Sequence, residues 1–147
     1  MYIWEDMVRC YLNNFYQNIT NNRIIFSETP LRNVCFQKKS FNVNEAKPNE
    51  FIEPDFYCVD GDKQLIFDAK YYSDIRGVDY KQLAYTFILR EGKYSKTYSA
   101  LILPSSKRDT SVHFKLNETY SPSEEELIIT EEYLNIRDVI LKYISNN

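Results

Sequence analysis

One β-hairpin restricts how this chain can fold more than any other feature of its sequence. Two short apolar runs, 56–59 and 65–67, flank the turn-forming residues 60–63, and this arrangement predicts two antiparallel strands. Because side chains alternate along a strand, the apolar residues Leu65 and Ile66 point to opposite faces. A strand that is apolar on both faces needs cover on both sides, so we expect it inside a sheet with helices on either face.

The rest of the chain alternates between helical and extended patterns. Apolar residues recur with helical spacing over about 2–17 and again over 80–91, before Gly92, and Asn135 can cap a final helix. Extended patterns are expected over four further ranges: 23–26, 97–103, 112–116 and 127–129. This order predicts an α/β fold in a single domain, residues 1–147, with a mixed β-sheet, a central hairpin and helices on both sides.

The composition excludes several classes of protein. The 147 residues carry a net charge of −3, which argues against a self-sufficient DNA binder, and the three glycines lie too far apart for a glycine-rich phosphate loop. The three cysteines lack metal-binding spacing, and we expect the single histidine, His113, to be structural or at the surface. No apolar run approaches the ~18 residues of a membrane span, and the N-terminus lacks the pattern of a signal peptide, so we expect a cytoplasmic protein.

Charged residues at one end of the predicted hairpin point to chemistry. Asp68 and Lys70 lie two apart on the second strand and share a face, and the hairpin brings Asp55, at the start of the first strand, close to both. Unpaired charges on a buried strand are costly. Two carboxylates with a nearby carbonyl suit Mg²⁺ or Mn²⁺, which can activate water against a phosphodiester. The alternative is a structural Asp–Lys ion pair at the strand end.

The same residues resemble the motif of the PD-(D/E)XK nuclease superfamily. The motif is carried by the Glu-Pro-Asp string at 53–55 and the Phe-Asp-Ala-Lys string at 67–70. The flanking sequences, which are Trp4 with Glu5 in the first predicted helix and the string at 79–85, are similar to the nuclease part of LlaJI and McrBC-type (McrC-like) restriction systems. The resemblance implies a restriction-endonuclease-like core and a Mg²⁺-dependent (or Mn²⁺-dependent) enzyme that hydrolyses DNA phosphodiesters.

The resemblance also assigns roles to individual residues. It implies that Asp55 and Asp68 are metal ligands together with the Ala69 carbonyl, and that Lys70 is the catalytic lysine. Glu5 matches an acidic residue on the first helix of related nucleases, and it lies at the margin of the apolar stripe, from which it can reach the sheet. Its alternative role is a solvated glutamate favoured by the helix dipole.

Further candidates lie on the helix after the motif and among the basic residues. Gln82 matches a glutamine that follows the motif in some branches of the family, with Tyr85 three residues later. On an ideal helical wheel Gln82 lies opposite the apolar stripe, so we expect it to face DNA or a neighbouring site rather than the core. Lys38, Lys39, Lys81 and Tyr85 are candidate DNA contacts, and the alternative for the lysines is an ordinary solvated surface.

The resemblance implies two partners, double-stranded DNA and an AAA+ GTPase motor subunit, in a restriction or defence complex. Nuclease subunits of this family carry extra N-terminal sequence, so we expect the chain to be a domain excised from a longer protein. Two alternatives stay open. One is a non-catalytic module that keeps the nuclease fold to bind DNA or protein, and the other is a stand-alone resolvase or repair nuclease, which predicts a homodimer with a basic cleft.

Overall fold

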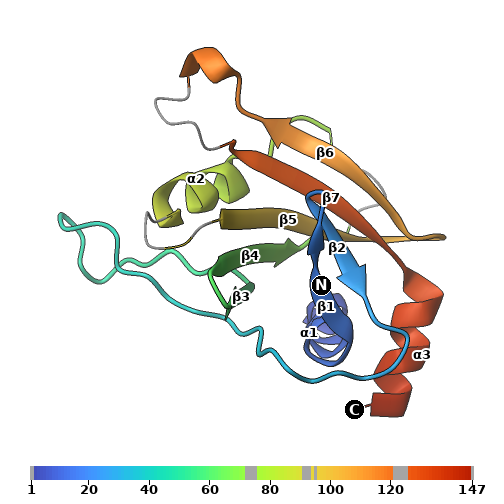
Figure 1. Ribbon diagram of the computed structural model, residues 1–147. Coiled ribbons are helices and arrows are strands. Elements are labelled where there is room, and N and C mark those ends of the chain that lie inside the picture. Colours follow the sequence, from blue (N-terminus) through green and yellow to red (C-terminus); the bar gives the residue numbers. More distant parts are fainter. Residues whose placement is uncertain (1, 72–75, 91–93, 95, 121–125, 147) are drawn as a thin grey trace.

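The structure is a computed structural model that describes residues 2–71, 76–90, 94, 96–120 and 126–146 (Figure 1). Four strands separate its first two α-helices, and a short 3-10 helix lies at Glu118–Tyr120. The helices and strands are α1 (Tyr2–Phe15), β1 (Tyr16–Thr20), β2 (Arg23–Phe26), β3 (Phe56–Asp60), β4 (Lys63–Ala69), α2 (Tyr80–Leu89), β5 (Lys96–Ser105), β6 (Asp109–Lys115), β7 (Ile128–Asn135) and α3 (Ile136–Asn146).

A five-stranded mixed sheet forms the centre of the fold, which is therefore mixed α/β as predicted. Its strand order is β3-β4-β5-β7-β6, with β4, β5 and β7 parallel to one another and β3 and β6 antiparallel to their neighbours. The predicted hairpin is confirmed, because β3 pairs with β4 from Phe56 opposite Phe67 to Asp60 opposite Lys63. Gly61 in its turn has a φ of 63°, in the left-handed region that favours glycine.

The prediction that this hairpin is central is wrong in part. β4 is an inner strand, buried from Gln64 to Ala69, but β3 is the last strand in the order. The outer side of β3 is partly covered by the chain between β2 and β3, since Gln37 exchanges backbone hydrogen bonds of 3.2 and 2.8 Å with Tyr57. A local sequence pattern was enough to predict that β4 is buried. Whether β3 has a further neighbour depends on distant parts of the chain, so the local pattern did not show that β3 is an edge strand.

The two faces of the sheet are covered by different helices, as predicted. On one face, α1 packs on β4, while α3 and β2 pack on β7, around buried aromatic side chains, among them Trp4, Phe15 and Phe67. On the other face, α2 packs on Ile66 and Tyr57 through Tyr85 and Leu89. Figure 1 shows α2 on one side of the sheet and α1 with α3 on the other.

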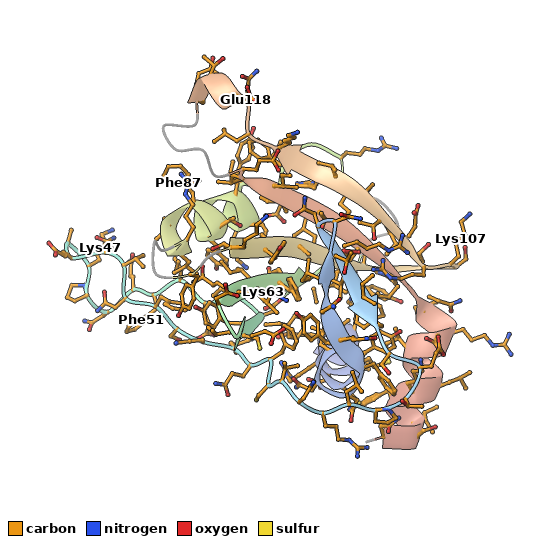
Figure 2. All side chains as sticks on the ribbon, in the orientation of Figure 1. Lys47, Phe51, Lys63, Phe87, Lys107 and Glu118 are labelled. Atoms are coloured by element: carbon orange, nitrogen blue, oxygen red, sulfur yellow. The ribbon has the colours of Figure 1, made fainter. Side chains whose placement is uncertain are left out.

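The orientation of α2 differs from the helical-wheel prediction. Apolar residues of the predicted inner stripe face outward, with Tyr80 74% and Phe87 53% exposed, whereas Gln82 is 0% exposed. Figure 2 shows Phe87 on the side of α2 turned away from the sheet. The inward side is polar because the sheet offers it polar partners: the Ser99 hydroxyl on β5 bonds both Gln82 and Thr86, at 2.8 and 2.7 Å.

The remaining elements follow the predictions with shifts at their ends. The first helix ends at Phe15 instead of continuing to about 17, because the chain turns there into β1, a strand that the polar sequence did not indicate. The Asn135 cap is confirmed by a 3.1 Å hydrogen bond from the Asp138 N–H to the Asn135 side chain. The expected stop at Gly92 lies outside the described residues. None of the helices in the described ranges is long and apolar enough to cross a membrane.

Candidate active site

The candidate site is formed where β3 begins and β4 ends. The hairpin register places Asp55, just before β3, beside Asp68 on β4, as the sequence predicted. The Asp55 N–H donates to Oδ1 of Asp68 at 2.9 Å, and the Ala69 N–H donates to Oδ2 of Asp55 at 3.0 Å. These two bonds hold the carboxylates side by side. Each carboxylate keeps one oxygen that accepts neither of them.

The close approach of these carboxylates has an electrostatic consequence. Burial and the neighbouring Asp68 charge raise the pKa of Asp55, although the bond from Ala69 and the charge of Lys38 oppose the shift. Without a cation, burial and the neighbouring carboxylate thus disfavour the charged form of Asp55. A divalent ion relieves this repulsion, so the electrostatics of the pair fit a metal site.

Lys70 follows β4 and places its ammonium between two carboxylates. Nζ lies 3.5 Å from Oδ2 of Asp68 and 3.4 Å from Oδ2 of Asp79, and its backbone is fixed by a 2.9 Å bond from the Lys70 N–H to the Ile102 carbonyl. Burial lowers the pKa of Lys70, but the two carboxylates outweigh it and the pKa is raised. Lys70 is consequently a fixed positive charge at neutral pH.

Asp79 is the site residue to which the sequence analysis gave no role. It is the N-cap of α2, where its Oδ1 accepts a 2.9 Å bond from the Gln82 N–H, and its Oδ2 faces Lys70. An aspartate directly before a helical stripe predicts a cap. Nothing in the local pattern shows which lysine lies next to that cap.

Glu5 reaches the interior from α1, so its side chain is not a solvated glutamate. Its Oε1 pairs with Lys38 Nζ at 3.2 Å and with Arg9 Nη2 at 3.4 Å. The hydrogen bond to Glu5 raises the pKa of Lys38, and the charges of Glu5 and Asp55 add to the shift. Among the described residues, no group of three or more His, Cys, Asp and Glu side chains that could hold a metal is found, and the role of Glu5 as a metal ligand stays a prediction.

The structure contradicts the prediction that Gln82 faces DNA. Its side chain is fully buried under α2, where Nε2 donates to the Ile66 carbonyl at 3.0 Å and to Ser99 Oγ at 2.8 Å. The helical-wheel argument failed because it assigned the apolar side of α2 to the core. In this position Gln82 fastens α2 to β4 and β5.

The prediction that Tyr85 contacts DNA is wrong, because its ring is buried with Tyr57 and Leu89 and packs on the sheet. Lys39 is exposed, and its ammonium lies over the Phe41 and Tyr57 rings, 5.2 and 5.1 Å from their centroids. Contact between Lys39 and DNA stays a prediction.

Two of the predicted basic residues do lie at the carboxylates. Lys81 is exposed, and its Nζ is 3.7 Å from Oδ2 of Asp68. Lys38 pairs with Glu5, and its pKa is also raised by the Asp55 charge. Lys70 and Lys81 both lie near Oδ2 of Asp68, at 3.5 and 3.7 Å.

The donor set at this site fits a divalent cation of the Mg²⁺ or Mn²⁺ kind. Asp55 and Asp68 supply carboxylate oxygens, the ligands such hard cations prefer. In a strand the N–H and C=O of one residue project to the same edge, so the Ala69 carbonyl lies on the edge where its N–H meets Asp55. The two carboxylates and this carbonyl therefore belong to the same edge of the hairpin, which is compatible with a shared ion.

The fold and the site together define a class: a mixed α/β protein with two paired carboxylates and a half-buried lysine at the end of a sheet hairpin. No protein-family model matches the chain, and no curated protein matches it either. The function is therefore argued from the site itself.

Proposed function

We propose that the protein is a Mg²⁺-dependent or Mn²⁺-dependent DNA endonuclease with a restriction-endonuclease-like core of the PD-(D/E)XK type. One observation carries the proposal: Asp55 and Asp68 are locked together by reciprocal backbone bonds, with the Lys70 ammonium 3.5 Å from Asp68. This combination supplies ligands for a divalent ion and a positive charge for a phosphate in one small volume. The mixed sheet with helices on both faces supports the assignment of the core.

The residues of the site have different roles in the proposed reaction. Asp55, Asp68 and the Ala69 carbonyl would hold the ion, which when bound polarises a phosphate oxygen and lowers the pKa of its bound water. The Lys70 ammonium is 3.5 Å from Oδ2 of Asp68, so it lies beside the proposed ion site, where its role is to stabilise negative charge that develops on the phosphate.

The surrounding charges indicate how DNA reaches the site. Lys38 and Lys81 flank the carboxylates, and we assign them to contacts with DNA phosphates. The whole chain is nevertheless acidic, with a net charge of −3, so its own attraction to DNA is weak. We therefore propose that a partner delivers the DNA. The resemblance to McrBC-type restriction systems implies that this partner is an AAA+ GTPase motor subunit of a restriction or defence complex.

Plasmid cleavage is the first test of the proposal. We expect the purified chain to nick supercoiled double-stranded DNA with Mn²⁺ or Mg²⁺ and to lose all nicking in EDTA. Cleavage that persists in EDTA would contradict the metal-dependent assignment. Because the chain binds DNA weakly, the assay uses micromolar protein at low salt.

Metal binding separates the enzyme from a non-catalytic module of the same fold. We expect calorimetry with Mn²⁺ to show saturable binding that disappears in Asp55→Asn and Asp68→Asn. Glu53→Gln is the matched control, since Glu53 is exposed and its side chain bonds the Ser40 hydroxyl outside the carboxylate pair. Absence of saturable binding in the unmodified protein would favour the non-catalytic module.

A further inference from the structure

The single histidine of the chain is buried beside the candidate site, and the proposed chemistry does not use it. His113 lies on β6 at the point where its register with β7 shifts, and its side chain is 2% exposed. Nδ1 is 2.8 Å from Oε2 of Glu131 on β7, and Nε2 accepts a 2.9 Å bond from the backbone N–H of Asp79. Since Nε2 accepts, the ring proton is on Nδ1 and points at Glu131.

The orientation of Glu131 is itself fixed. Its Oε1 accepts from the Tyr133 hydroxyl and from Ser111 Oγ, the latter at 3.3 Å. Its other oxygen is thereby left for the His113 ring. A carboxylate held by two hydroxyls sets both the tautomer and the plane of the histidine, in the way that acidic partners orient imidazoles at catalytic sites.

Asp79 connects this pair to the lysine of the site. The bond to His113 fixes the backbone of Asp79, and the α2 cap uses its Oδ1. Oδ2 is therefore directed to Lys70, 3.4 Å from Nζ. A continuous chain of contacts runs from Glu131 through His113 and Asp79 to the Lys70 ammonium.

A helix cap alone does not account for this arrangement. An aspartate N-cap needs only its side chain and the first turn of the helix, whereas here a buried His–Glu pair also holds its backbone. Burying these polar groups is costly unless they are paired, so the network has a specific geometry to maintain. The network fixes the position of the Lys70 ammonium. The other carboxylate beside this ammonium belongs to Asp68, the proposed ligand of the metal ion. Asp79 is the carboxylate that stays with the lysine when a cation takes Asp68.

We propose that His113, oriented by Glu131, is a positioning residue that holds Asp79 and through it sets the Lys70 ammonium in the site. The catalytic consequence rests on the proposed nuclease function, but the placement of Lys70 is measurable without any activity. His113 contacts neither the acidic pair nor the reacting groups, so it acts only through Asp79.

Four variants test the proposal. His113→Leu removes both ring contacts, and His113→Gln places an amide oxygen where Nε2 accepts from Asp79. Glu131→Gln removes the charge that orients the ring. Asp79→Asn keeps a good helix cap but loses the negative charge at Lys70. This variant therefore distinguishes the effect of the ion pair from the effect of the cap. Circular dichroism and thermal unfolding verify that each variant is folded, and Asp79→Asn decides the outcome if His113→Leu does not fold.

The first readout is the chemical reactivity of Lys70. Acetylation by a water-soluble active ester, followed residue by residue by mass spectrometry, is slow for a protonated amine held between carboxylates with 17% of its side chain exposed. We expect the Lys70 rate to rise severalfold in His113→Leu, Glu131→Gln and Asp79→Asn and to stay near the unmodified protein's in His113→Gln. The rate at Lys63, at the far end of β4, is the internal reference and stays unchanged.

The second readout is cleavage kinetics. We expect kcat to fall by about tenfold or more in His113→Leu and Asp79→Asn with little change in KM for DNA, because misplacing a catalytic group acts on the chemical step. His113→Gln should recover most of the rate. Unchanged Lys70 reactivity and unchanged kcat in folded His113→Leu and Asp79→Asn would overturn the inference. A wild-type protein that cleaves no DNA while Lys70 reactivity still responds would instead overturn the nuclease proposal and leave the positioning network standing.

Discussion

The corrected place of Gln82 leads to a prediction that separates a structural residue from a catalytic one. In the structure its amide makes two buried hydrogen bonds, to the Ile66 carbonyl at 3.0 Å and to Ser99 Oγ at 2.8 Å. A glutamine in a DNA-facing catalytic role would be solvated until substrate arrives. If Gln82 is structural, Gln82→Ala lowers the stability of the protein and leaves cleavage nearly unchanged. If Gln82 is catalytic, the substitution lowers cleavage and leaves stability nearly unchanged.

The expected loss in the free energy of unfolding follows from the contacts that Gln82→Ala removes. Two hydrogen bonds at about 1 kcal/mol each, and one buried methylene at about 0.8 kcal/mol, give a loss of about 3 kcal/mol in the free energy of unfolding. For a chain of this size that loss lowers Tm by roughly 6–12 °C. We expect urea and thermal unfolding of Gln82→Ala to show this loss, and we expect DNA cleavage at a temperature where the variant is folded to be nearly unchanged.

Gln64 provides the matched control on the same strand. It is also fully buried, its Nε2 donates to the Tyr57 hydroxyl at 2.8 Å and its Oε1 accepts from the Thr97 hydroxyl at 2.9 Å. Because it lies at the turn end of β4, far from Asp68, Gln64→Ala should lose a similar amount of stability and no activity. A Gln82→Ala protein as stable as the unmodified one but with strongly reduced cleavage would refute the structural role.

Three further predictions test other parts of the structure. Because the pKa of Asp55 is raised in the fold, the folded state holds that proton more tightly than the unfolded chain, and stability is lost as pH rises from about 4 through the raised pKa. We expect Asp55→Asn, without metal, to have a higher Tm than the unmodified protein at pH 7 and an equal Tm at pH 3.5, and an equal or lower Tm at pH 7 would contradict the repulsion. Phe87→Ala should change the free energy of unfolding by less than about 1 kcal/mol, whereas Leu89→Ala should cost about 2–5 kcal/mol, and urea denaturation giving the reverse order would contradict the orientation of α2. Gly61→Ala should cost about 1 kcal/mol in the same assay because of its φ of 63°, and no cost would show that the turn relaxes.

The sequence was sufficient to place the two carboxylates together. Hairpin pairing is local, and the turn at Gly61 fixes the register that sets Asp55 against Asp68. Strand alternation likewise showed that β4 is covered on both faces. These inferences hold because each depends on residues fewer than about 15 positions apart, where backbone geometry leaves few options.

The sequence was insufficient wherever a residue's surroundings come from distant strands. The polar side of α2 faces inward because Ser99 of β5 receives it, and no local pattern shows that Ser99 lies below Gln82. For the same reason the sequence did not predict the network at His113, because it joins residues on β6 and β7 to the cap of α2. Strand β1 was missed because Asn18, with Asn21 and Asn22 just after the strand, is typical of a turn, and the pairing with β2 outweighs that preference.

The most direct test of the central claim is the rate of metal-dependent plasmid nicking in Lys70→Ala and Asp68→Asn. Lys63→Ala is the matched control on the same strand, five residues and roughly 16 Å from Asp68. The account predicts that both site variants remain folded and lose nicking with Mg²⁺ or Mn²⁺, while Lys63→Ala cleaves at the rate of the unmodified protein. Folded Lys70→Ala and Asp68→Asn proteins that nick DNA as fast as the control would contradict the assignment of Asp55, Asp68 and Lys70 as the active site.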